Sequence, residues 1–174
     1  MKEVTKKEIN KILQVILFLV ISIIFVLPYL VQISTYFHEK AHQKYLTKYG
    51  VENFYQLNLI ATIPGFFNPD NDKLGVTRFS ISQYLVLDKY QRTQVNLAGI
   101  MSDLKLLFLI GIYLSFANIY LFYKLKYQKS ANWTAVLAIN WILFMWLLVL
   151  IQITIANVSY SAGDVYQLIR FLRT

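Results

Sequence analysis

Residues 12–31 read ILQVILFLVISIIFVLPYLV, an apolar run without a charged residue. A helix needs about 20 such residues to cross the hydrocarbon core of a bilayer. Two later runs, 101–123 and 133–156, are comparably long and apolar. The first run is longer than the core of a secretory signal and no small-residue cleavage site follows it, so we expect a retained anchor. The pattern predicts an all-α membrane protein with about three transmembrane helices.

The composition of the chain agrees with a membrane protein. Hydrophobic residues make up 57% and charged residues 15% of the 174 residues, whereas soluble domains average about 25% charged. Cysteine is absent, which excludes disulfides, a thiolate nucleophile and cysteine metal ligands. The net charge of +8 comes from scattered basic residues, so we expect membrane lipid as a partner and not nucleic acid. No repeat or linker divides the chain, and we expect a single membrane-embedded domain over residues 1–174.

The segment between the first two apolar runs has a different character. Residues 54–63 and 75–81 are rich in β-branched and aromatic residues, and turn formers separate them. This pattern predicts a small β-hairpin in the loop between spans one and two.

Helix signals extend two of the spans toward this loop. The first helix is expected to run from about Glu8 through Tyr49, with a kink at Pro28 and a stop at Gly50. Asp88 and Gln91 have the spacing of a helix start, so the second helix should begin well before its apolar run.

The sequence His38-Glu39-Lys40-Ala41-His42 contains both histidines of the chain. On a helix the two rings lie one turn apart on one face, so both can bind a single zinc while Glu39 stays free as a general base. A catalytic zinc takes a third protein ligand. Without cysteine, that ligand must come from an oxygen donor.

Alternating spans bring the end of span one, the start of span two and the end of span three to one side of the membrane. Those ends carry His38 and His42, Asn96 and Asp103, and Asp164, respectively. We predict Asp164 as the third zinc ligand, with a helix-capping acid as its other interpretation and Asp103 as the alternative ligand. Asn96 could bind substrate or a developing oxyanion, or make a contact between helices.

Three segments resemble the intramembrane zinc metalloproteases of the site-2 protease family, or small zincin relatives of them. They are Phe37–His42, Asn96–Ser102 and Gly163-Asp164. The resemblance implies that His38, His42 and Asp164 bind zinc and that Glu39 is the base. The chain departs from the family pattern in having Gly-Asp where the family has Asp-Gly, and Ile100 where the family has proline.

The leading hypothesis is a zinc-dependent endopeptidase that cleaves a peptide bond in or near the membrane, using zinc-bound water activated by Glu39. Its substrate would be a membrane-associated or transmembrane peptide. The alternatives are a non-catalytic membrane protein of the immunity or transporter-accessory type that retains a metal site, and a zinc hydrolase acting on lipid or another amide. We expect a multi-pass protein in the plasma membrane of a prokaryote. Basic residues at the N-terminus and at 124–129 predict that these segments lie in the cytoplasm.

Overall fold

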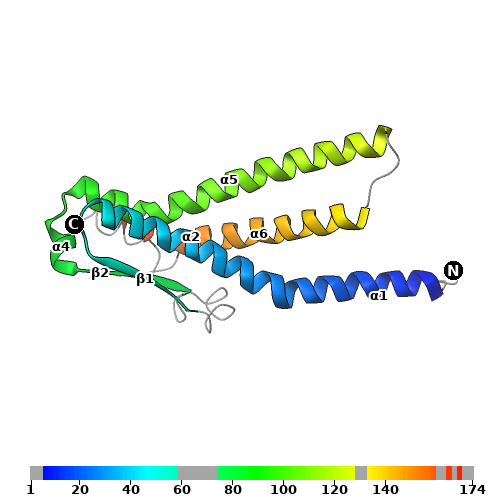
Figure 1. Cartoon of the computed structure of the whole chain (residues 1–174), viewed down its shortest axis with the longest axis horizontal. Helices are drawn as coiled ribbons and strands as arrows, with labels where there is room; N and C mark the ends of the chain where they lie inside the picture. The colour runs from blue at the N-terminus through cyan, green and yellow to red at the C-terminus, as the bar shows by residue number, and fades with distance from the viewer. Residues whose placement is uncertain (1–5, 59–73, 128–132, 160–163, 166–167, 170–174) are drawn as a thin grey trace.

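The computed structural model describes residues 6–58, 74–127, 133–159, 164–165 and 168–169. The chain begins with a long rod made of three consecutive helical segments, α1 (Lys6–Ile21), the π-helix η1 (Ser22–Val26) and α2 (Leu27–Lys48). The rod bends where α1 passes into α2 (Figure 1). Helix therefore continues through the predicted first span and well beyond it.

The bend lies next to Pro28, as the sequence predicts. Proline has no N–H and its ring crowds the carbonyl of the preceding turn. The turn before it is widened, so that the Leu27 N–H bonds back to the Ser22 carbonyl, while the Ser22 hydroxyl donates to the Phe18 carbonyl at 2.7 Å. α2 ends where expected, since Gly50 has a φ of 72°, a left-handed conformation that favours glycine.

An antiparallel hairpin follows α2 and confirms the predicted one. β1 (Asn53–Leu57) pairs with β2 (Gly75–Phe79), with Asn53 opposite Phe79 and Leu57 opposite Gly75. The remainder of the predicted first strand, residues 59–63, lies outside the described residues. The second strand is shorter than predicted, because a short helix, α4 (Ile81–Val86), begins after Ser80.

Two long helices complete the fold, α5 (Lys89–Tyr127) and α6 (Trp133–Ser159). α5 begins with the predicted capping pair, in which the Gln91 N–H donates to Asp88 Oδ1 at 2.8 Å and the Asp88 N–H donates to Gln91 Oε1 at 3.0 Å. The hairpin and α4 lie at one end of the molecule, opposite the N-terminus (Figure 1).

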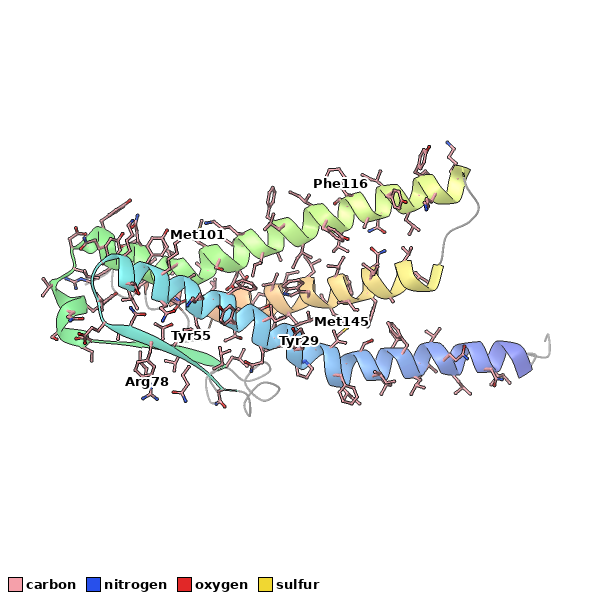
Figure 2. All side chains as sticks on the ribbon, in the orientation of Figure 1. Tyr29, Tyr55, Arg78, Met101, Phe116 and Met145 are labelled. Carbon is pink, nitrogen blue, oxygen red and sulfur yellow. The ribbon has the colours of Figure 1, made fainter. Side chains whose placement is uncertain are left out.

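The described chain is mostly helical and has three helices long and apolar enough to cross a membrane, Leu13–Lys48, Lys89–Lys124 and Val136–Ser159. Large apolar side chains such as Phe25, Phe116 and Phe122 are exposed along them, and Phe116 projects away from the other helices (Figure 2). Exposed apolar surface of this kind suits contact with membrane lipid. The fold class predicted from the sequence is confirmed.

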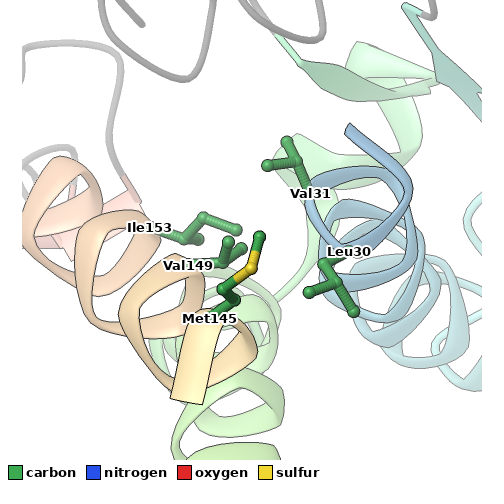
Figure 3. Close-up of a cluster of buried hydrophobic side chains, with 5 residues drawn as sticks. All are labelled: Leu30, Val31, Met145, Val149 and Ile153. Carbon is green, nitrogen blue, oxygen red and sulfur yellow. The ribbon is translucent and has the colours of Figure 1, made fainter. Parts of the chain in front are cut away.

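Two apolar clusters fix the helices around the hairpin end. Leu30 and Val31 of α2 pack against one face of α6, as Figure 3 shows, through Met145, Val149 and Ile153. Next to this cluster, the Trp146 indole N–H donates to the Ser34 hydroxyl at 2.9 Å. A second cluster joins the end of α2 to the start of α5 and comprises Leu46, Val51, Leu87 and Val95. The two clusters pack α6 and the start of α5 against α2, the helix that carries both histidines.

Candidate metal centre

His38 and His42 lie on one face of α2, as their spacing predicts. Both are buried, with 7% and 8% of their surface exposed. The ring centroids are 5.0 Å apart, and the two Nε2 atoms approach to 3.3 Å. The Nε2 atoms therefore share one small space between α2 and its neighbours.

The carboxylate of Asp164 completes this group. Its Oδ2 atom lies 2.8 Å from the Nε2 atoms of both His38 and His42. Asp164 follows the end of α6, where its backbone N–H lies 3.4 Å from Asn157 Oδ1. The three ligand atoms all lie within 4.8 Å of one another, and the group could hold a metal ion.

Asp164 is in the ionised state that a metal ligand requires. Burial raises the pKa of its carboxyl, but hydrogen bonds donated by His38 and His42 and the positive charge of these rings when they are protonated together lower that pKa by more. The net pKa lies well below the ordinary value for aspartate. Negative charge is therefore present beside the two rings across the neutral pH range.

The other ring nitrogens are held by two groups on α5. The Nδ1 atom of His38 lies 2.7 Å from Asp103 Oδ2, and the Nδ1 atom of His42 lies 2.8 Å from the Val95 carbonyl oxygen. A carbonyl oxygen and a carboxylate only accept hydrogen bonds, so each Nδ1 carries the proton. In the neutral rings each Nε2 then presents a lone pair.

When both rings are neutral, as metal binding requires, three electron-rich atoms face one another: two Nε2 lone pairs and Asp164 Oδ2. Like partial charges at these separations repel, and the repulsion is strong where water is largely excluded. Protonation of both rings would place two cations in one buried space, which is also unfavourable. A single cation among the three atoms satisfies all of them, so the donor set fits a bound metal ion.

Asp103 lies behind His38, on the side of the ring away from Asp164. Its surface is 0% exposed, and its second oxygen, Oδ1, has no hydrogen-bond partner among the described residues. The sequence leaves Asp103 open as an alternative ligand. The structure places its carboxylate against Nδ1, whereas Asp164 occupies the Nε2 side.

Gly99 of α5 faces the rings directly. A Cβ atom added at this position would lie 2.4 Å from His38 Nε2 and 2.5 Å from His42 Nε2. Real Cβ atoms essentially never make such contacts. Any residue other than glycine would place its side chain at the candidate metal position.

Glu39 is buried, with 8% of its surface exposed, but it does not belong to the group of three ligands. It faces the hairpin, where its Oε2 atom accepts a hydrogen bond from the Thr77 hydroxyl at 2.6 Å. Asn96 is also turned elsewhere, since its Oδ1 accepts a hydrogen bond from the Tyr84 hydroxyl at 3.0 Å.

Sequence reasoning did not identify the Val95 carbonyl or Thr77. Every residue has a backbone carbonyl, so the sequence does not indicate that the Val95 carbonyl contacts His42. Thr77 lies 38 positions from Glu39, and only the docking of the hairpin on α2 brings the two together.

Comparisons with known proteins do not assign this chain to a family. No protein-family model matches it, and no curated protein or solved structure is significantly similar to it. The fold and the geometry of the metal centre therefore carry the functional argument.

Proposed function

We propose that this protein is a zinc-dependent membrane endopeptidase that hydrolyses peptide bonds in or beside the membrane. The observation that carries the proposal is the arrangement around His38 and His42. Both Nδ1 atoms are committed as donors, both Nε2 lone pairs converge with the Asp164 carboxylate, and a glutamate stands between the histidines in sequence. A purely structural zinc site has no need of that glutamate.

Zinc is the metal that this donor set suits best. Two imidazoles and one carboxylate form a known ligand set of catalytic zinc, which leaves one position for water. The two Nε2 atoms lie 3.3 Å apart and Asp164 Oδ2 lies 2.8 Å from each, so these three residues would hold a single ion. When bound, zinc would supply a Lewis acid that makes water nucleophilic near neutral pH.

The residues of the chain have separate tasks in this mechanism. Asp103 and the Val95 carbonyl hold the rings in the tautomer that directs Nε2 at the metal. Asp164 offsets positive charge at the centre. Glu39 accepts a proton from the attacking water and delivers it to the leaving amine.

The position of the site also suits peptide hydrolysis at a membrane. His38 lies several residues beyond the apolar run of residues 12–31, where the chain becomes more polar. An intact helix shields its peptide carbonyls by hydrogen bonding. A substrate is therefore expected to reach the centre as an unwound or extended segment close to the membrane surface.

Zinc stoichiometry of the detergent-purified protein tests the ligand set. We expect one zinc per chain in wild type and none after His38→Ala or Asp164→Ala. Asp103→Ala should keep the stoichiometry at saturating zinc and lower the affinity about 10–100-fold, because it removes a ring-orienting partner and not a ligand. Zinc that persists after Asp164→Ala and disappears after Asp103→Ala would assign the third ligand to Asp103.

Hydrolysis is tested with a mixture of synthetic peptides, each with an apolar segment next to a polar linker, analysed by mass spectrometry. Zinc-loaded wild type should cleave members of the mixture, and Glu39→Gln should bind zinc without cleaving. If zinc-loaded wild type cleaves none of them, the peptidase assignment is wrong and a metal-binding membrane protein without this activity remains. Equal cleavage by Glu39→Gln would exclude Glu39 as the base.

A further inference from the structure

The Glu39 side chain is held from outside its own helix by the hairpin. Thr77 Oγ1 lies 2.6 Å from Glu39 Oε2 and 3.2 Å from the Glu39 carbonyl oxygen. The shorter contact is a charge-assisted hydrogen bond, which is stronger than one between neutral groups. This hydrogen bond uses Oε2 and does not involve the other carboxylate oxygen, Oε1.

We propose that Thr77 is a positioning residue that fixes the Glu39 carboxylate for proton transfer, an inference that rests on the proposed function. A glutamate side chain has several rotatable bonds and populates many rotamers when it is unrestrained. A general base must reach the proton it takes within hydrogen-bond distance. With Oε2 bound to Thr77, the carboxylate has one orientation and Oε1 remains available to act on water.

The hairpin has its own anchors that determine where Thr77 stands. Thr77 is paired directly with Tyr55 across the two strands. The Tyr55 ring packs edge-on against Tyr36 of α2 at 5.6 Å, and the Lys40 ammonium lies 5.3 Å from the centre of the Tyr55 ring. Tyr36 and Lys40 are one helical turn apart and Glu39 lies between them in the sequence, so β1 aligns Thr77 with Glu39.

The backbone of β2 also lies close to the Glu39 side chain at Gly75. A Cβ atom added at Gly75 would lie 2.7 Å from Thr35 Cγ2 and 3.0 Å from Glu39 Cγ. Only a glycine lets the strand approach the helix this closely. The Glu39 stem therefore lies against the strand while its carboxylate is bound to the Thr77 hydroxyl, and both contacts restrict it to one conformation.

Two substitutions at Thr77 separate a hydrogen-bonding role from a packing role. Thr77→Val keeps the shape of the side chain and loses the hydroxyl, whereas Thr77→Ser keeps the hydroxyl and loses a methyl group. Thr93→Val is the matched control, because the Thr93 hydroxyl donates only to the Lys89 carbonyl of its own helix, at 2.8 Å. Zinc content, kcat and KM would be measured for each, with the peptide from the mixture that wild type cleaves fastest.

We expect Thr77→Val to bind zinc as wild type does, to lower kcat about 10–100-fold, as loss of an orienting partner typically does, and to leave KM unchanged. Thr77→Ser should restore kcat to near the wild-type value, and Thr93→Val should not alter it. An unchanged or higher kcat in Thr77→Val would overturn the proposal. A loss of kcat in Thr77→Ser that equals the loss in Thr77→Val would assign Thr77 to packing instead.

A second measurement does not depend on hydrolysis. Thermal unfolding of the zinc-loaded protein would be followed for Thr77→Val, Glu39→Ala and the double variant, which measures the coupling between the two side chains. We expect Thr77→Val to lower the Tm in wild type and to cause no further loss in the Glu39→Ala background. Additive losses would show that the hydrogen bond is not formed and would overturn the inference, even if the peptidase assignment holds. Coupled losses of Tm in a protein that cleaves no peptide would show that the contact between Thr77 and Glu39 is present. The proposed function would then be wrong, and with it the role of Thr77 in proton transfer.

Discussion

At the scale of single residues, the Nε2 atoms of His38 and His42 face a position where Gly99 has no side chain. Replacing Gly99 by alanine would put a methyl carbon 2.4 Å from His38 Nε2, in the space that the metal is proposed to occupy. We predict that Gly99→Ala abolishes stoichiometric zinc binding, measured by metal analysis of the purified protein.

Gly111 provides the control for this prediction, since it lies on the same helix and an added Cβ there meets nothing within 4 Å. Gly111→Ala should bind zinc as wild type does. A full complement of zinc in Gly99→Ala would show that the metal, if present, lies elsewhere.

The sequence brings the candidate ligands together more readily than it predicts their surroundings. A separation of four residues on a helix is enough to place His38 and His42 together, and alternating spans are enough to bring Asp103 and Asp164 to the same end. Which carboxylate faces Nε2 depends on how α5 and α6 are rotated about their axes. That rotation is set by the packing of many side chains, so the sequence does not decide which aspartate faces Nε2. In the structure the two aspartates lie on opposite sides of the His38 ring.

At the scale of elements, the end of α2 depends on the backbone of Gly50. Its φ of 72° is unfavourable for a residue with a Cβ, and an added Cβ meets nothing within 4 Å, so conformation alone decides the effect. We predict that Gly50→Ala destabilises the protein by about 1–2 kcal/mol, seen as a lower Tm, with zinc stoichiometry retained. Gly50→Asn should be less harmful, because asparagine tolerates this conformation better. Equal Tm values for wild type and Gly50→Ala would contradict a left-handed conformation of Gly50 at the end of α2.

Long periodic elements are predictable here and short ones are not. The apolar runs and the Asp88/Gln91 capping pair identify the helices because many residues, or a specific hydrogen-bonded spacing, contribute to each signal. α4 (Ile81–Val86) has only six residues, three of them β-branched or aliphatic, and such a segment has no strong preference of its own. α4 lies where the chain turns between β2 and α5. The need for this turn comes from the tertiary structure, so the local sequence does not predict the helix.

At the scale of the whole molecule, the metal is proposed to join segments that are far apart in the chain. His42 on α2 and Asp164 beyond α6 are 122 positions apart, and a shared ion would connect them only in the folded state. A ligand that binds only the folded state at about 100 times its Kd adds about 2.7 kcal/mol of stability. We predict that a zinc chelator lowers the Tm of wild type and leaves the Tm of His42→Ala unchanged, measured by thermal unfolding in detergent. An equal effect of chelator on both proteins would exclude a stabilising metal at this centre.

The side of the membrane that the centre faces follows from the distribution of lysines over the whole chain. Lys124 and Lys126 lie at the end of α5 opposite the hairpin, and the positive-inside rule places that end in the cytoplasm.

The chain has no cysteine, so a single introduced cysteine is the only thiol available for labelling. We predict that Lys44→Cys, exposed beside the metal centre on α2, reacts with a membrane-impermeant maleimide in intact cells. Lys126→Cys should react only after the membrane is permeabilised, and wild type should not react under either condition. The reverse pattern would place the centre in the cytoplasm, and the substrate would then have to present its extended segment from that side.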